Sequence, residues 1–143
     1  MPDIKEGRLT FRFPASWQAM KYDETRFYQK HFQHCAASKC VDIVAFNSDT
    51  NEPLWLIEIK DYRAQRRTKT QDLCDELAQK VRDTLANLFM AQRKEGADCY
   101  AFAVAAAQRM QIRFVLHLEQ PHKPSRLYPW VAERAQLHLK LRQ

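Results

Sequence analysis

The sequence predicts an α/β fold, with a mixed central β-sheet flanked by helices. Two apolar runs, 41–46 and 54–59, are separated by residues 47–53, which are nearly all turn formers, and this is the pattern of a β-hairpin. Both runs are apolar at almost every position, so both faces of these strands should be covered. A long segment with helical periodicity, 68–93, follows the hairpin and can provide one cover. We therefore expect the hairpin to lie at the centre of the sheet.

The segments before the hairpin predict one strand and one helix. Leu9, Phe11 and Phe13 alternate with polar residues, which is the period of a half-buried strand that Pro14 ends. Ser16 can cap a short turn that follows.

From Asp23 the apolar spacing becomes helical. Phe27, Phe32 and Cys35 should share one side of this helix, with Asp23 as its N-cap.

The helix after the hairpin has the clearest pattern in the chain. Thr68 and Gln71 have the spacing of a capping box, and the helix should run to about Arg93, before Gly96. Its apolar stripe, at spacings of three and four residues, consists of Leu73, Leu77, Val81, Leu85 and Leu88. This stripe should pack on the sheet.

The remaining elements are a helix over 98–110, a strand over 112–118 and a C-terminal helix. The alanine content of 98–110 favours a helix, although a buried strand at 99–104 is an alternative. His117 in the following strand is predicted to be a core or rim histidine. The last helix is expected to begin at Pro129, with these residues near one face: Trp130, Val131, Arg134, Leu137 and Leu141.

Three charged residues interrupt the apolar hairpin: Asp42, Glu58 and Lys60. If the hairpin is centred near Thr50, facing residues have numbers that sum to roughly 100, which places Asp42 opposite Glu58. Because side chains alternate along a strand, Lys60 lies on the same face as Glu58. All three should meet at one end of the sheet.

This arrangement has two interpretations. Two facing carboxylates in an apolar setting repel each other, and a hard divalent ion such as Mg²⁺ or Mn²⁺ would relieve the cost of burying them. Alternatively, Lys60 forms an ion pair with Glu58 or Asp42 at the rim of the sheet.

Asp42, a hairpin and then Glu58-Ile59-Lys60 resemble the PD-(D/E)xK nuclease superfamily, of restriction endonuclease-like fold, over residues 23–89. Val41 stands where the named pattern has proline, a position at which members often differ. The resemblance implies that Asp42 and Glu58 bind Mg²⁺, and that Lys60 positions or activates the attacking water.

The resemblance also implies secondary site residues. A helix before the Asp strand often carries a further acidic residue in this superfamily, and Glu24 matches it, although the helix dipole also favours an acid there. Gln79 and Lys80 match a helix that brings glutamine or lysine to the site, and ordinary boundary residues are the alternative.

The loop after Lys60 is basic, with Arg63, Arg66, Arg67 and Lys69 close together. It leaves the end of the sheet where the three charges should meet, so these cations, with Lys80, are expected to contact the phosphates of DNA. A solvated surface loop is the alternative. The net charge of +6 also favours a polyanionic partner.

The composition is that of one globular domain, residues 1–143, with 45% hydrophobic and 28% charged residues. Neither a long apolar run nor a signal-peptide core is visible, so we expect a cytoplasmic protein without a membrane segment. The four cysteines should be reduced thiols. The spacing of His31, His34, Cys35 and Cys40 matches no standard zinc pattern.

The expected function is hydrolysis of DNA phosphodiester bonds by a metal-dependent endonuclease or exonuclease of restriction, repair or mobile-element defence type. The alternative is a noncatalytic PD-(D/E)xK-like module that binds nucleic acid or protein. Cleavage of both strands of a duplex would require a homodimer, which the sequence leaves open. Calorimetry with Mn²⁺ on the parent chain and on Asp42→Ala distinguishes the enzyme from the noncatalytic module.

Overall fold

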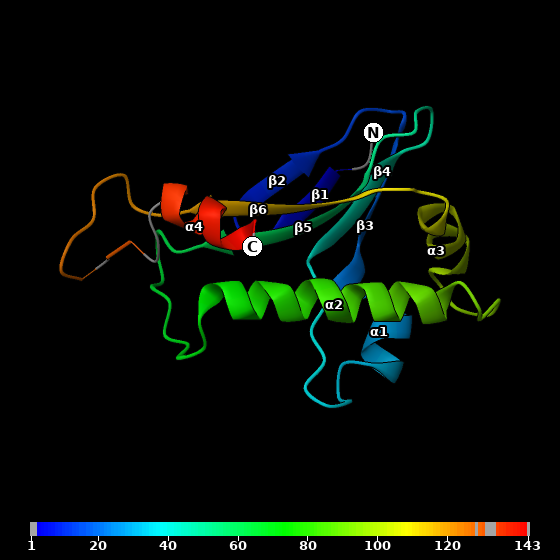
Figure 1. Cartoon of the computed structure of the whole chain (residues 1–143), viewed down its shortest axis with the longest axis horizontal. Helices are drawn as coiled ribbons and strands as arrows, with labels where there is room; N and C mark the ends of the chain where they lie inside the picture. Colours follow the sequence, from blue (N-terminus) through cyan, green and yellow to red (C-terminus); the bar gives the residue numbers. More distant parts are fainter. Residues whose placement is uncertain (1–2, 128, 131–133, 143) are drawn as a thin grey trace.

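The computed structural model describes residues 3–127, 129–130 and 134–142, and it has the expected α/β architecture. A four-stranded sheet has the order β3-β4-β5-β6 (Figure 1). Its strands are β3 (Trp17–Lys21), β4 (Ile43–Asn47), β5 (Leu54–Asp61) and β6 (Ile112–Glu119). The β4–β5 hairpin is antiparallel and central, as predicted, and β6 pairs parallel to β5.

The register of the hairpin agrees with the sequence argument. Ile43 pairs with Ile57 and Val44 with Leu56, so facing residue numbers sum to the expected value. Strand β4 is buried on both faces, and most of β5 is as well. Continuing the same register by one residue places Asp42 across from Glu58.

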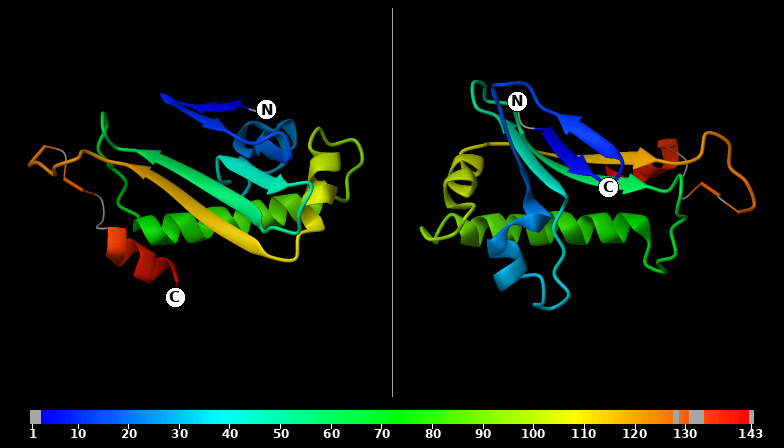
Figure 2. Two further views of the ribbon diagram at one scale, coloured as in Figure 1. Left: turned by 90° about the horizontal axis from the view of Figure 1, so that it is seen from above. Right: turned by 180° about the vertical axis from the view of Figure 1, so that it is seen from behind.

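Helices cover one face of the sheet and a small hairpin covers the other (Figures 1 and 2). The helical side contains α1 (Arg26–His31), α2 (Leu73–Ala91) and α3 (Tyr100–Ala107). The opposite side contains a separate two-stranded sheet, β1 (Asp3–Glu6) with β2 (Leu9–Arg12), whose turn uses Gly7 at φ +56°. The central strands therefore have an apolar cover on each side.

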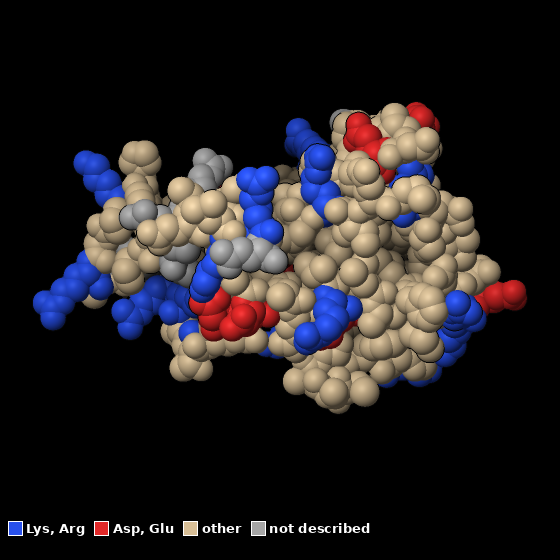
Figure 3. Space-filling view, viewed as in Figure 1, with Lys and Arg blue, Asp and Glu red and all other residues tan. Residues whose placement is uncertain are grey.

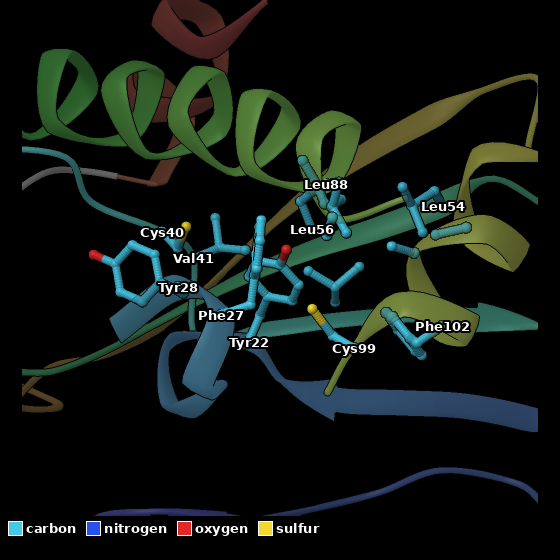
Figure 4. Packing of buried hydrophobic residues seen from close by; sticks show 14 of the residues in the cluster. Tyr22, Phe27, Tyr28, Cys40, Val41, Leu54, Leu56, Leu88, Cys99 and Phe102 are labelled. Atoms are coloured by element: carbon cyan, nitrogen blue, oxygen red, sulfur yellow. The ribbon is translucent and has the colours of Figure 1, made fainter. Parts of the chain in front are cut away.

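Even-numbered and odd-numbered residues of the hairpin separate into two cores. Val44 and Leu56 join the core under the helices, with Leu88 of α2 and Phe102 of α3 (Figure 4). The odd-numbered residues Ile43, Ala45, Ile57 and Ile59 pack instead with Ile4 and Phe13. By this alternation, Asp42, Glu58 and Lys60 belong to the face that α2 covers.

Helix α2 has the predicted stripe but a different start. Leu73, Leu77 and Leu88 are buried in the core. Thr68 and Gln71 do not form the cap: the helix begins at Leu73, and the Asp72 carboxylate accepts a hydrogen bond from Cys74 N at 2.9 Å. The carboxylate is the better cap, because it also interacts favourably with the positive end of the helix dipole.

The predicted helix at Asp23 begins later. Asp23 lies in the 3-10 turn η1 (Tyr22–Glu24), and Thr25 is the N-cap of α1, accepting from Tyr28 N at 3.3 Å. The helix ends at His31, and Cys35 is exposed. The expected apolar side therefore does not extend to Cys35.

The C-terminal half agrees with most expectations. Strand β6 is confirmed, and α3 confirms the helix within 98–110, excluding the strand alternative. His117 is a rim residue: its ring packs edge-on against Phe11, and Nε2 lies 3.0 Å from Glu119 Oε1.

The final helix, α4, is described as Arg134–Leu141, and it contacts α2. Pro129 and Trp130 precede it instead of forming its first turn, and Val131 lies outside the described residues. Among the described helices, none is both long and apolar enough to cross a membrane.

Strands β1 and β3 were not predicted. Residues 17–20 were expected to form a turn, yet β3 pairs with β4 along its whole length. Its central residue, Ala19, has a small side chain, so the alternation of apolar and polar residues that indicates an edge strand is weak here.

Candidate functional site

The structure brings Asp42, Glu58 and Lys60 together at one end of the hairpin. Asp42 immediately precedes β4, and its Oδ2 accepts a hydrogen bond from Ile59 N of β5 at 2.7 Å. Glu58 and Lys60 lie two residues apart on β5, with Lys60 Nζ 3.0 Å from Glu58 Oε1. The predicted juxtaposition is therefore present.

Helix α2 contributes a second cation to Glu58. Lys80 Nζ lies 2.5 Å from the same oxygen, Oε1. The Glu58 side chain is 1% exposed, and the side chains of Lys60 and Lys80 are each 13% exposed. The other oxygen, Oε2, is buried and has no hydrogen-bond partner among the described residues.

Glu76, also on α2, is the centre of a second ion-pair cluster, which sequence reasoning missed. Its side chain is fully buried, and Oε1 lies 3.0 Å from Lys60 Nζ and 2.7 Å from Lys69 Nζ. Oε2 lies 2.6 Å from Arg67 Nη1. Lys60 therefore bridges Glu58 of the sheet and Glu76 of the helix.

A sequence signal for Glu76 was available. Glu76 and Lys80 are one helical turn apart, and Glu76 lies beside Leu73 and Leu77 on the buried stripe of α2. A charged residue inside an apolar stripe requires partners. The candidates were the lysines and arginines of the preceding loop.

Burial raises the pKa of both carboxylates near the hairpin, but the net shifts are opposite. For Asp42, burial and the neighbouring Glu58 raise the pKa to about 7, although the hydrogen bond from Ile59 N opposes this. For Glu76, burial alone would raise the pKa, but hydrogen bonds from Lys69, Lys60 and Arg67 lower it below its usual range. Glu76 is therefore ionised at neutral pH, whereas Asp42 titrates near neutrality.

Lys60 stays charged. Burial disfavours its ammonium form, but Glu58 and Glu76 outweigh that effect, and the pKa of Lys60 is raised. At neutral pH its ammonium group is the link between the two clusters.

Glu24 does not join this group through any contact that the described residues show. Its carboxylate lies 2.7 Å from Lys21 Nζ, and its side chain is 60% exposed. The neighbouring Asp23 interacts with Asp42 electrostatically, because its charge contributes to the raised pKa of Asp42. Burial raises the pKa of Asp23 itself to about 6. The acidic residue that the first helical segment brings toward Asp42 is thus Asp23.

The side chain of Gln79, the other secondary candidate, points elsewhere. Its Nε2 donates to Ala37 O at 3.0 Å. Lys80, one residue on, reaches Glu58.

The basic side chains of the loop 62–72 differ in their hydrogen-bond and ion-pair partners. The side chain of Arg63 forms two hydrogen bonds to the carboxylate of Asp61. Arg67 donates to Tyr62 Oη at 3.1 Å and to Gln71 O at 2.9 Å, in addition to its pair with Glu76.

Two other cations of this loop are more accessible. Lys69 pairs with Glu76 but remains 50% exposed. Arg66 is exposed and has no ion pair with any described residue. Arg66 and Lys69, rather than Arg67, are therefore placed to contact a ligand.

Figure 3 shows lysine and arginine side chains gathered at the end of the molecule where the loops 62–72 and 120–130 lie. Three exposed basic residues of the second loop are His122, Lys123 and Arg126. A hollow lined by Arg66, Arg67, Lys69, Pro129 and Trp130 joins the two loops. This end of the molecule suits an anionic ligand.

Asp42 and Glu58 offer few ligands to a metal ion. No cluster of three or more His, Cys, Asp or Glu residues suited to a metal occurs in the described part of the chain. Two carboxylates, one with the unpartnered Glu58 Oε2, fit a hard cation that keeps most of its water shell. Lys60 and Lys80 already balance the charge of Glu58, so Mg²⁺ or Mn²⁺ binding stays a prediction.

The chain is 35% identical, over an alignment of 172 residues, to the cysteine–tRNA ligase of Neisseria meningitidis serogroup A. The alignment includes 96% of this chain but only 24% of the length of that relative. No family model matches the chain, and no solved structure matches it. The resemblance to the PD-(D/E)xK superfamily therefore stays a prediction about the fold family.

This similarity contradicts the function that we expected from the sequence. The relative is a tRNA ligase, and its name points to tRNA chemistry and not to cleavage of DNA for restriction, repair or defence. We correct the expected function accordingly.

Proposed function

We propose that this chain is an accessory RNA-binding module. It would bind tRNA through the phosphate backbone and assist the aminoacylation of that tRNA. The observation that carries the proposal is the similarity over 96% of the chain to part of a cysteine–tRNA ligase, a protein named for its action on tRNA. Because the chain corresponds to about a quarter of that relative, the proposed role is that of a module and not of a complete ligase.

The charge of the molecule supports this role. The net charge is +6, and cations release counterions from nucleic acid when they neutralise its phosphates. The exposed residues Arg66 and Lys69 lie beside the second basic loop at one end of the molecule. Buried ion pairs hold the base of this surface in place, since Arg67 and Lys69 are both fixed to Glu76.

The test is binding of a labelled cysteine-accepting tRNA, measured by fluorescence anisotropy between about 50 and 200 mM salt. We expect Arg66→Ala to weaken binding and to reduce the slope of log K against log salt by about 0.7–0.9, the value for one lost phosphate contact. The matched control is Arg93→Ala, which removes the same charge just beyond the other end of α2, where Arg93 packs on Phe89.

The control should leave the salt slope unchanged. A parent chain that does not bind tRNA at the lowest salt would overturn the proposal. Equal effects of Arg66→Ala and Arg93→Ala would show that tRNA does not use the end of the molecule where the two basic loops meet.

A further inference from the structure

Trp130 is an exposed aromatic residue in a polar, proline-containing loop. It is 41% exposed, whereas Trp17 and Trp55 are partly buried in the core between the sheet and the β1–β2 hairpin. Its Nε1 donates to Pro121 O at 2.6 Å, which satisfies the polar atom of the ring and ties one edge of it to the loop. The ring is therefore held in position without being buried.

Two cations with exposed surface line the same hollow as this ring. Arg66 and Lys69 approach it from the loop after β5, and Pro129 and Trp130 approach it from the loop after β6. The hollow has a volume of about 270 Å³. An aromatic side chain beside positive charge matches a nucleotide, which has a flat base and an anionic phosphate.

The loop after β5 also lines a second hollow, which includes a residue of the ion-pair clusters, Lys60. Arg66, Arg67 and Lys69 also line this second hollow, together with Lys60 and Tyr62. The two hollows therefore share three cations, with Trp130 lining one hollow and the end of β5 lining the other.

We propose that Trp130 stacks on an unpaired base of a single-stranded RNA segment while Arg66 and Lys69 hold the adjoining phosphates. The segment must be single-stranded because a base in a duplex already has neighbours on both faces. This inference rests on the proposed RNA-binding function and specifies which form of RNA the module recognises.

The experiment compares binding of a short, unstructured single-stranded RNA with binding of the same sequence as a duplex. Trp130→Ala should weaken binding to the single strand about 5- to 150-fold, the scale for one stacked base, while the salt slope stays the same. Trp130→Phe should retain most of the affinity, because it keeps an aromatic face. Binding to the duplex should change little in either variant.

The matched control is Phe89→Ala, which removes a 51% exposed aromatic ring near the C-terminal end of α2. A direct second readout is intrinsic fluorescence: single-stranded RNA should quench the parent chain, and Trp130→Phe should lose that quenching. Thermal melting of each variant confirms that the fold is intact.

The outcomes separate the two proposals. If the parent chain binds neither tRNA nor single-stranded RNA, the proposed function is wrong and the stacking inference is wrong with it. If RNA binds but Trp130→Ala has the parent affinity and quenching is unchanged in Trp130→Phe, only the stacking inference is overturned.

Discussion

Burial controls the chemistry of Asp42. The residue is 9% exposed, and burial together with Glu58 raises its pKa to about 7 from an unfolded value of 3.8. The folded protein therefore holds this proton more tightly than the unfolded chain does. Between about pH 4 and pH 7 the carboxyl group of Asp42 is ionised in the unfolded chain but protonated in the folded protein. The free energy of unfolding therefore falls as the pH rises through this range, and the full loss is present above pH 7.

Asp42→Asn should for this reason be more stable than the parent chain at pH 8, by about 1–4 kcal/mol, and nearly equal to it at about pH 4. Urea unfolding at several pH values measures the difference. Asp49→Asn is the control, because Asp49 is exposed in the loop between β4 and β5 and should show no such trend. A stabilisation that does not depend on pH would contradict the assigned cause.

At this scale the sequence predicted the meeting of Asp42, Glu58 and Lys60, because strand alternation and a hairpin register determine it. It did not predict that Lys80 would share the same Glu58 oxygen with Lys60. That contact depends on how α2 is rotated against the sheet, and the helical pattern fixes only which side of α2 is apolar.

Among the elements, α2 connects the sheet to the basic loop. Glu76 near its start binds Lys60 of β5 together with Arg67 and Lys69 of the loop 62–72. Farther along the helix, Thr84 Oγ1 accepts a hydrogen bond from Val41 N at 2.9 Å, beside Asp42. One helix thus positions the charged residues of the sheet end and the loop.

Glu76→Gln should lower the free energy of unfolding by about 3–5 kcal/mol at pH 7, since it leaves partly buried cations without their counter-charge. It should also make the loop 62–72 easier to cleave with trypsin. Glu95→Gln, an exposed carboxylate beyond α2, should change stability by less than about 0.5 kcal/mol. Similar stabilities for the two variants would show that the cluster around Glu76 does not stabilise the fold.

The sequence predicted the existence and type of α2 well, and its first residue less well. The capping-box pattern places the start at Thr68, whereas the helix begins after Asp72, and helix ends are the least certain part of a pattern-based assignment. Residues beyond the local pattern contact this segment: Arg67 donates to Gln71 O, and Lys140 of α4 pairs with Asp72.

In the whole molecule, the central hairpin lies between helices on one face and the small β1–β2 hairpin on the other. The helices form the larger core, and the β1–β2 hairpin with Phe13 closes the opposite face. The sequence predicted covers on both faces from the apolar character of the central strands. It did not identify β1 or β3, because these short strands with half-exposed residues have a weak pattern.

Phe13→Ala tests the second cover. Phe13 is 8% exposed, and the variant should lose about 3–5 kcal/mol of unfolding free energy. Phe89→Ala, which removes an identical ring that is 51% exposed, should lose much less. Equal losses in urea unfolding would show that the β1–β2 hairpin contributes little to the fold.

The parallel pairing of β5 with β6 has a consequence for the order of folding. The first pair, Leu54 with Ile112, joins residues that are separated in the chain by α2, α3 and the basic loop. Because closing so long a segment costs entropy before any strand contact forms, this pairing should follow the local β4–β5 hairpin in time. Residues 66–69 and Trp130 belong to the two loops that leave the ends of β5 and β6. Their shared hollow should therefore be among the last parts of the molecule to form, and a chain emerging from the ribosome would lack it until β6 has docked.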